Sequence, residues 1–271
     1  MPASAIALAA GLVGLAGAQP VIEFEETQRV RTDAEVFIVL DTSRSMLAKE
    51  RPGTPSRIAR SKAAAQALRD ALPALPVGLA SITDRALPHL FPTATGETFR
   101  VTLARAIGIQ RPPPIGTLQS RSTKLDAIAV FATRGFYSPN ARNRLLIVLT
   151  DGETQPWRER LDVLFRRPPG VQTVFVQFGS LDERVFAGHL PEPGYRPDPS
   201  ARKTLDRFAA AVGGAVFSER ELAAAKRRVR VVVGSGPTVV RGERREHVAL
   251  APFLAGAALL PVALLLWRRD R

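Results

Sequence analysis

Two short segments of the sequence carry oxygen-bearing side chains at a spacing that suits a metal ion. They are residues 41–45 (DTSRS) and 150–153 (TDGE). Carboxylates and hydroxyls are the hard oxygen ligands that Mg²⁺, Mn²⁺ and Ca²⁺ prefer. Ser43 and Ser45 lie in one short loop, so both hydroxyls can point at a single ion. The carboxylates of Asp41 and Asp151 offset the ion's charge, and the neutral hydroxyls leave it an attraction for one further anion.

A buried strand is predicted directly before each segment. Residues 34–40 (AEVFIVL) and 144–150 (RLLIVLT) are nearly continuous apolar runs rich in β-branched side chains. Such runs are typical of strands that are buried on both faces of a parallel sheet. In an open α/β sheet, ligands bind at the edge where the carboxyl ends of the strands meet. We therefore expect Asp41 and Asp151 to converge on one edge.

The rest of the central region alternates between helix-like and strand-like patterns. Helices are expected at 56–72, 99–109, 123–134, 200–212 and 219–230, and further strands at 77–83, 171–178 and 215–217. The segment 91–96 is rich in turn formers. This alternation predicts an α/β fold with a doubly wound, mainly parallel sheet and helices on both faces.

Each acidic segment also has an ordinary structural interpretation. Residues 41–45 could cap a helix or form an Asx turn, and Asp151-Gly152 could form a hairpin turn. The hairpin fits poorly, because residues 154–167 do not have the pattern of a paired strand.

The D-x-S-x-S motif behind a hydrophobic strand resembles the metal-ion-dependent adhesion site (MIDAS) of von Willebrand factor A (VWA) domains. Asp41, Ser43 and Ser45 match its three positions, Asp151 matches the family's second aspartate, and Thr123 matches its threonine. The resemblance covers about 34–230 and implies a VWA domain. It also implies that the serines bind the metal directly, while the aspartates often act through waters.

The threonine position has two candidates. The family usually places glycines before it, whereas Thr123 follows Arg121 and Ser122. Thr117 is the alternative.

The resemblance implies a protein-binding module and not an enzyme. A partner protein would supply an aspartate or glutamate carboxylate to a bound Mg²⁺, or to Mn²⁺ or Ca²⁺. Hydrophobic segments on both sides of such a domain resemble bacterial Bat-type aerotolerance membrane proteins, which implies an envelope complex linked to a MoxR-type ATPase.

Two alternatives belong to other classes. A haloacid-dehalogenase-type phosphohydrolase would need a second acid two residues after Asp41, where this chain has Ser43. A metal-free structural scaffold is the other alternative, and the complete set of five oxygen-bearing side chains that matches the MIDAS argues against it.

The segment 248–267 contains no charged residue. Twenty helical residues span about 30 Å, the thickness of the hydrocarbon core of a bilayer. Arg268, Arg269 and Arg271 follow at once, and the positive-inside rule predicts a cytoplasmic tail at 268–271. We therefore expect a transmembrane helix at 248–267 in the cell membrane, with an extracytoplasmic VWA domain.

The N-terminal segment 1–22 is apolar and rich in alanine and glycine. It is either a signal peptide or a first transmembrane helix. Residues 23–33 are interpreted as a linker, and residues 231–247 as an extended connector to the C-terminal helix.

Composition excludes several other functions. The 271 residues include no cysteine and three histidines, which argues against thiolate chemistry and a histidine-rich zinc site. The net charge of +13 indicates compositional bias, or binding to nucleic acid, an anionic membrane or an acidic partner. With only two Tyr and two Trp, no basic stretch interleaves with aromatics, so nucleic-acid binding is not expected. Arg44 could steer an acidic partner, and Glu153 is expected to face solvent.

Overall fold

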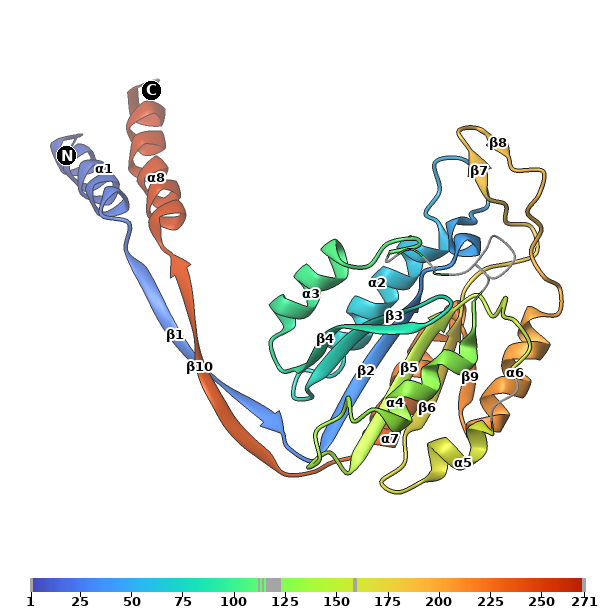
Figure 1. Ribbon diagram of the computed structural model, residues 1–271. Coiled ribbons are helices and arrows are strands. Elements are labelled where there is room, and N and C mark those ends of the chain that lie inside the picture. The colour runs from blue at the N-terminus through green and yellow to red at the C-terminus, as the bar shows by residue number, and fades with distance from the viewer. Residues whose placement is uncertain (1, 112, 114, 116–122, 158–159, 270–271) are drawn as a thin grey trace. The chain divides into compact units, whose positions relative to one another are not determined.

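The computed structural model describes the chain except for residues 1, 112, 114, 116–122, 158–159 and 270–271 (Figure 1). It divides into two compact units. One consists of Met1–Arg29 and Val240–Arg271, and the other is Val30–Val239.

The larger unit is built on a six-stranded sheet with the strand order β4-β3-β2-β5-β6-β9. All neighbouring strands run parallel except β3 and β4, which are antiparallel. The strands are β2 (Ala34–Asp41), β3 (Val77–Ile82), β4 (Ala86–Thr93), β5 (Asn143–Thr150), β6 (Gln172–Gln177) and β9 (Ala215–Ser218).

Helices cover both faces of this sheet (Figure 1). Alternate residues of β2 explain why: Ile38 and Leu40 pack into one core cluster, and Phe37 and Val39 pack into the other. Because both faces are buried, the strand is apolar throughout and the expected doubly wound, mainly parallel α/β fold is confirmed. One face carries α2 (Arg57–Asp70), α3 (Gly96–Arg105) and α7 (Leu222–Val233), and the other carries α4 (Val130–Thr133), α5 (Leu161–Arg166) and α6 (Ala201–Ala211).

The strand order reverses direction at β2. The chain continues from β2 to β3 on one side and later returns to β5 on the other. Leu40 of β2 pairs with Leu149 of β5, so Asp41 and Thr150 end the two strands side by side. A topological switch point of this kind leaves a crevice at the carboxyl ends of the strands.

The structure differs from the sequence-based expectation at β4 and near Thr123. Strand β4 includes residues 91–93, the first half of the segment that was expected to be a turn, and it tolerates Pro88 and Pro92 because it lies at the sheet edge. The helix expected at 123–134 is instead a 3₁₀ helix, η3 (Leu125–Ala129), followed by the single turn α4.

The smaller unit contains the hydrophobic termini. Helices α1 (Pro2–Gly17) and α8 (Ala251–Arg269) pack against each other, and the Leu250 amide donates a hydrogen bond to the Pro20 carbonyl over 2.8 Å. Most of the segments interpreted as linker and connector lie in β1 (Val21–Arg31) and β10 (Thr238–Ala249), which pair with each other. Within the described part of the chain, no helix combines the length and the apolar character needed to cross a membrane.

Candidate metal centre

Asp41 lies at the centre of the carboxyl edge and is fully buried. Its Oδ1 accepts a hydrogen bond from the Ser43 amide over 2.9 Å. The Thr150 hydroxyl donates to Oδ2 over 2.7 Å, and the Thr123 hydroxyl lies 3.1 Å from both oxygens. The carboxylate is therefore held by neutral donors from three segments of the chain.

No positively charged side chain is among the hydrogen-bond donors described for Asp41. Burial, and next the negative charge of Asp151, raise the pKa of Asp41 to about 7. Hydrogen bonds from Ser43 and Thr150 oppose this rise. Since a nearby cation favours the charged form of a carboxylate, the environment of Asp41 is suited to a positive ion.

Ser43 and Ser45 place their hydroxyl oxygens 3.0 Å apart. Mg²⁺ binds oxygens at about 2.1 Å in an octahedron, so two adjacent ligands are about 3 Å apart. Ser43 occupies the N-cap position of the 3₁₀ helix η1 (Arg44–Leu47), yet its side chain makes no capping hydrogen bond. The hydroxyl pair therefore fits adjacent ligands of such an ion better than it fits a helix cap.

Thr123 is fully buried and held from both sides. Its carbonyl accepts hydrogen bonds from the Gln155 amide and the Thr154 hydroxyl, each over 2.9 Å. The Lys124 amide, next in the chain, donates to the Thr83 carbonyl over 2.8 Å. These bonds fix the Thr123 hydroxyl against Asp41. The alternative threonine, Thr117, lies outside the described residues, as do Arg121 and Ser122.

Asp151 follows β5 at the same edge and is almost completely buried. Its Oδ1 accepts a hydrogen bond from the Glu153 amide over 3.0 Å, and its Oδ2 accepts one from Arg57 Nη1 over 2.9 Å. Asp151 thus lies beside the Asp41 group, but a guanidinium already offsets its charge.

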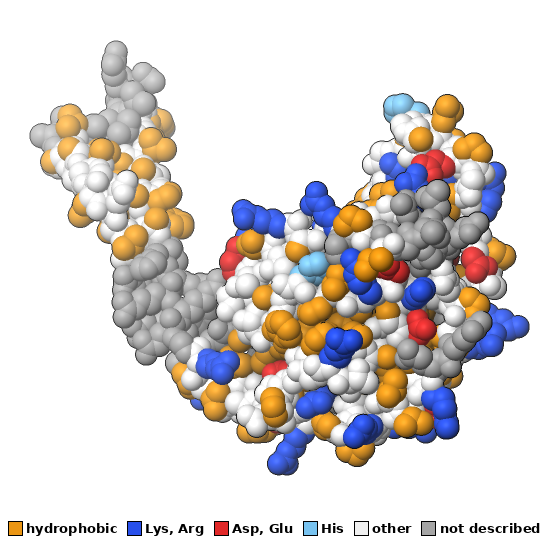
Figure 2. All heavy atoms as spheres, viewed as in Figure 1, with side chains coloured by type: hydrophobic (Ala, Val, Ile, Leu, Met, Phe, Trp, Pro, Cys, Tyr) orange, Lys and Arg blue, Asp and Glu red, His pale blue; other side chains and the backbone are white. Residues whose placement is uncertain are grey.

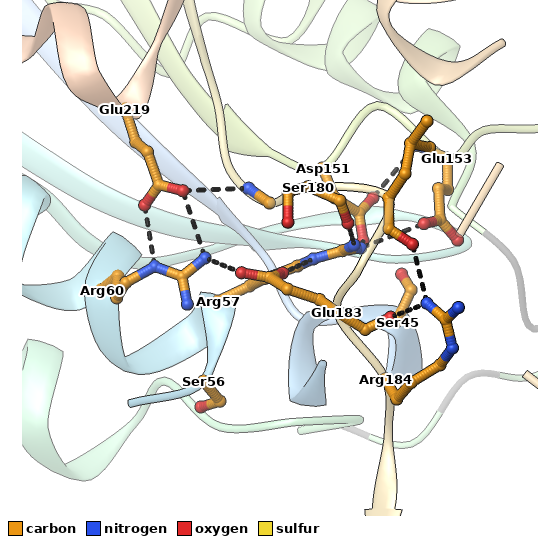
Figure 3. A network of polar contacts seen from close by, with 12 residues as sticks. Ser45, Ser56, Arg57, Arg60, Asp151, Glu153, Ser180, Glu183, Arg184 and Glu219 are labelled. Carbon is orange, nitrogen blue, oxygen red and sulfur yellow. Dashed lines mark hydrogen bonds and ion pairs between the residues drawn. The ribbon is translucent and has the colours of Figure 1, made fainter. Parts of the chain in front are cut away.

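Arg57 is the functional candidate that the sequence reasoning missed. Figure 3 shows this α2 side chain reaching to Asp151, Glu153 and Glu183. Burial disfavours its charge, but Asp151 and the other acidic neighbours outweigh burial and raise the pKa of Arg57 further above its ordinary value. One signal in the sequence could have identified it: a basic residue at the start of a helix opposes the helix dipole.

The expectation that Glu153 faces solvent is wrong, because its side chain is mostly buried. Its carboxylate accepts hydrogen bonds from Arg57 over 3.0 Å and from the Tyr195 hydroxyl over 2.7 Å, and only 17% of its side chain is exposed. Burial, and next the charge of Asp151, raise the pKa of Glu153. Arg44 is the exposed member of the loop and contacts Glu192.

Comparisons with solved structures find several similar chains. BatB from Bacteroides thetaiotaomicron is 21% identical, and the match covers 74% of this chain and 100% of that chain with a TM-score of 0.61. An aerotolerance-related membrane protein from Bacteroides fragilis is 22% identical over 74% of this chain and 98% of that chain, with a TM-score of 0.56. A von Willebrand factor type A structure from Catenulispora acidiphila is 16% identical over 78% of this chain and 49% of that chain, with a TM-score of 0.48.

The fold is that of a Bat-like VWA domain protein, as the sequence motif indicates. Neither a protein-family model nor a curated protein matches the sequence.

Proposed function

We propose that the chain is a metal-dependent protein-binding module. Asp41, Ser43, Ser45, Thr123 and Asp151 would hold one divalent cation, with Mg²⁺ as the first candidate and Mn²⁺ or Ca²⁺ as alternatives. The observation that carries the proposal is the pair of serine hydroxyls 3.0 Å apart beside a buried carboxylate that has neutral hydrogen-bond donors. Oxygen donors in this arrangement suit a hard cation.

The bound ion would attract an anionic group, and this chain's own residues would select it. The serine and threonine hydroxyls add no negative charge, so they leave the ion an attraction for a carboxylate. Arg44 and Lys124 adjoin ligand residues in the chain, and Arg44 is exposed although it also pairs with Glu192. On the face shown in Figure 2, Lys and Arg side chains are widely spread and Asp and Glu side chains are few. These features favour an aspartate or glutamate of a partner protein as the recognised group.

Partner capture tests this function. Immobilised full-length chain should retain proteins from an envelope extract in Mg²⁺ and release them with EDTA. Ser43→Ala should abolish the EDTA-sensitive capture. Ser61→Ala is a matched control, because Ser61 is a buried serine of α2 whose hydroxyl donates to the nearby Ile58 carbonyl and to no other residue that the structure describes. Capture that EDTA and Ser43→Ala leave unchanged would contradict the proposal.

We also propose that the chain is anchored in the cell membrane with the VWA domain outside the cytoplasm. The support comes from sequence: the uncharged run 248–267 and the arginines that follow it. A bilayer contact there, and a link to a MoxR-type ATPase in an envelope complex, stay predictions. Resistance to alkaline extraction and a reporter fused after Arg271 test the anchor and its orientation, and full release into the soluble fraction would contradict it.

A further inference from the structure

Arg57 has an unusual position for a charged residue. It is the first residue of α2, and only 2% of its side chain is exposed. The helix dipole disfavours positive charge there, and burying a charge is costly unless the charge is fully paired. Such a residue needs strong compensation from the groups that it faces.

The compensation comes from two parts of the chain that are distant in sequence. On one side lie the acids of the loop after β5, and on the other lies the hairpin segment (residues 180–199), which contains β7 (Phe186–Ala187) and β8 (Leu190–Pro191). A planar guanidinium with fixed donor directions can hold both sides in one geometry. Its nitrogens lie 2.9 Å from Asp151 Oδ2, 3.0 Å from Glu153 Oε1, 2.9 Å from Tyr195 Oη, 2.7 Å from Glu183 Oε2 and 3.3 Å from the Ser180 carbonyl oxygen.

The backbone before the hairpin segment is shaped around the same guanidinium. Gly179 has a φ of +108°, and a Cβ atom at this position would collide with the Arg57 side chain. Glycine therefore permits both the backbone conformation and the close approach.

The hairpin segment also borders Asp151. A cavity of about 230 Å³ lies beside the guanidinium, and Asp151 and Glu153 form one part of its lining. Pro197, Asp198 and Pro199 of the hairpin segment form another part. Arg57 thus stands between a proposed metal-binding carboxylate and a mostly exposed segment of the surface.

We propose that Arg57 is a positioning residue for the metal centre: it fixes the carboxylate of Asp151 and couples the hairpin segment to occupancy of the centre. The inference rests on the proposed metal-binding function. Groups that orient the ligands of a metal typically change its affinity about 10- to 100-fold when they are removed. Arg57 is such a group here, because it donates to a ligand carboxylate and also holds Glu183 and Tyr195.

The test uses the full-length chain in mild detergent, with Mn²⁺ alone as the probe. Isothermal titration should give a dissociation constant about 10- to 100-fold higher for Arg57→Met than for the wild type. Arg57→Lys should not restore binding, since one ammonium nitrogen lacks the planar fork of the guanidinium. Hydrogen exchange in the hairpin segment should respond to Mn²⁺ in the wild type and not in Arg57→Met.

Arg60→Met is the matched control. Arg60 lies on the same helix and pairs with Glu183 and Glu219, but it makes none of the hydrogen bonds described for Asp151. Its dissociation constant should stay within about twofold of the wild-type value, because it orients no proposed ligand. An equal loss in Arg60→Met, or wild-type Mn²⁺ affinity in folded Arg57→Met, would overturn the inference.

Two milder variants cover the case in which Arg57→Met does not fold. Glu183→Gln and Tyr195→Phe remove contacts of Arg57 while Arg57 and Asp151 stay in place. Both should raise the dissociation constant and weaken the exchange response of the hairpin segment, and wild-type behaviour in both would overturn the inference. If the wild type and Ser61→Ala both fail to bind Mn²⁺, the proposed function fails. If they bind and only the Arg57 effects are missing, the inference alone fails.

Discussion

The two aspartates at the carboxyl edge are almost equally buried, with exposed fractions of 0% for Asp41 and 2% for Asp151. Their carboxylates nevertheless have different kinds of partner. Asp41 is surrounded by hydroxyls and a backbone amide. Asp151 forms an ion pair with Arg57 over 2.9 Å. Asp151 thus has a cation supplied by the protein, whereas the partners of Asp41 are neutral as far as the described residues go.

This difference indicates that a bound metal ion would stabilise the carboxylate of Asp41 more than that of Asp151. A buried carboxylate with neutral partners gains strongly from a nearby positive charge, because burial and next the charge of Asp151 raise the pKa of Asp41 and a cation would oppose both. The Asp151 side is already compensated and contributes geometry as well as charge. The same substitution should therefore change the stability of the metal-free protein more at Asp151 than at Asp41.

The largest loss of stability should follow from removal of the Arg57 guanidinium, the positive charge that the protein itself places beside Asp151. Arg57→Met leaves Asp151 buried without its arginine and Glu183 with Arg60 alone, which should lower the free energy of unfolding by about 3–5 kcal/mol. Urea denaturation in EDTA measures it. Arg60→Met, where the arginine side chain is 24% exposed, should lose clearly less, and equal losses would mean that burial of the pair does not matter.

A matched pair of Asp→Asn changes tests the comparison directly. Asp151→Asn should lower the free energy of unfolding of the metal-free protein by about 1.5–3 kcal/mol, because it weakens a charge-assisted hydrogen bond. Asp41→Asn should change it by less than about 1 kcal/mol, because it removes a buried charge that lacks a cation. Urea denaturation in EDTA measures the free energy of unfolding of both variants. A larger loss in Asp41→Asn would contradict the conclusion that Asp151 is the aspartate paired with a cation of the protein.

The smallest expected effect on stability concerns the Arg31–Asp33 pair, which lies at the opposite end of β2 from Asp41. The hydrogen bond from Arg31 is the largest cause that lowers the pKa of Asp33 from 3.8. A lowered folded-state pKa gives stability that is present above the unfolded-state value and lost as the pH falls through the folded-state value. Asp33 is 19% exposed, so the contribution should be no more than about 1 kcal/mol.

Acid titration of the unfolding free energy measures this pair. As the pH falls from just above the ordinary aspartate pKa of 3.8 through the lowered pKa of Asp33, the wild type should lose slightly more stability than Asp33→Asn. Identical acid profiles would show that the Arg31–Asp33 pair contributes nothing.

The sequence predicts the Asp41 side of the site better than the Asp151 side, and the reason is physical. The runs before Asp41 and Asp151 are apolar because both faces of β2 and β5 are buried, and parallel strands must bring their carboxyl ends to one edge. Ser43 and Ser45 are then placed by local chain geometry. None of this depends on distant side chains.

Arg57 could not be assigned in the same way. Its partners lie 94 to 138 residues further along the chain, so no local spacing relates them. Locally, the sequence shows only that a basic residue begins the helix after Ser56, and it does not show which acids that residue faces. Glu153 was misjudged for the same reason, because its partners Arg57 and Tyr195 come from other elements. Strand β4 was missed because Pro88 and Pro92 normally end strands, and only its edge position makes them acceptable.

The most direct test of the account is a calorimetric titration of the metal-free, full-length chain with Mg²⁺ and Mn²⁺. We expect one site per chain in the wild type and in Ser61→Ala. Ser43→Ala should weaken binding at least about tenfold, which corresponds to about 1.4 kcal/mol. No detectable binding in the wild type, or equal affinity in Ser43→Ala, would contradict the claim that the oxygens around Asp41 form a cation site.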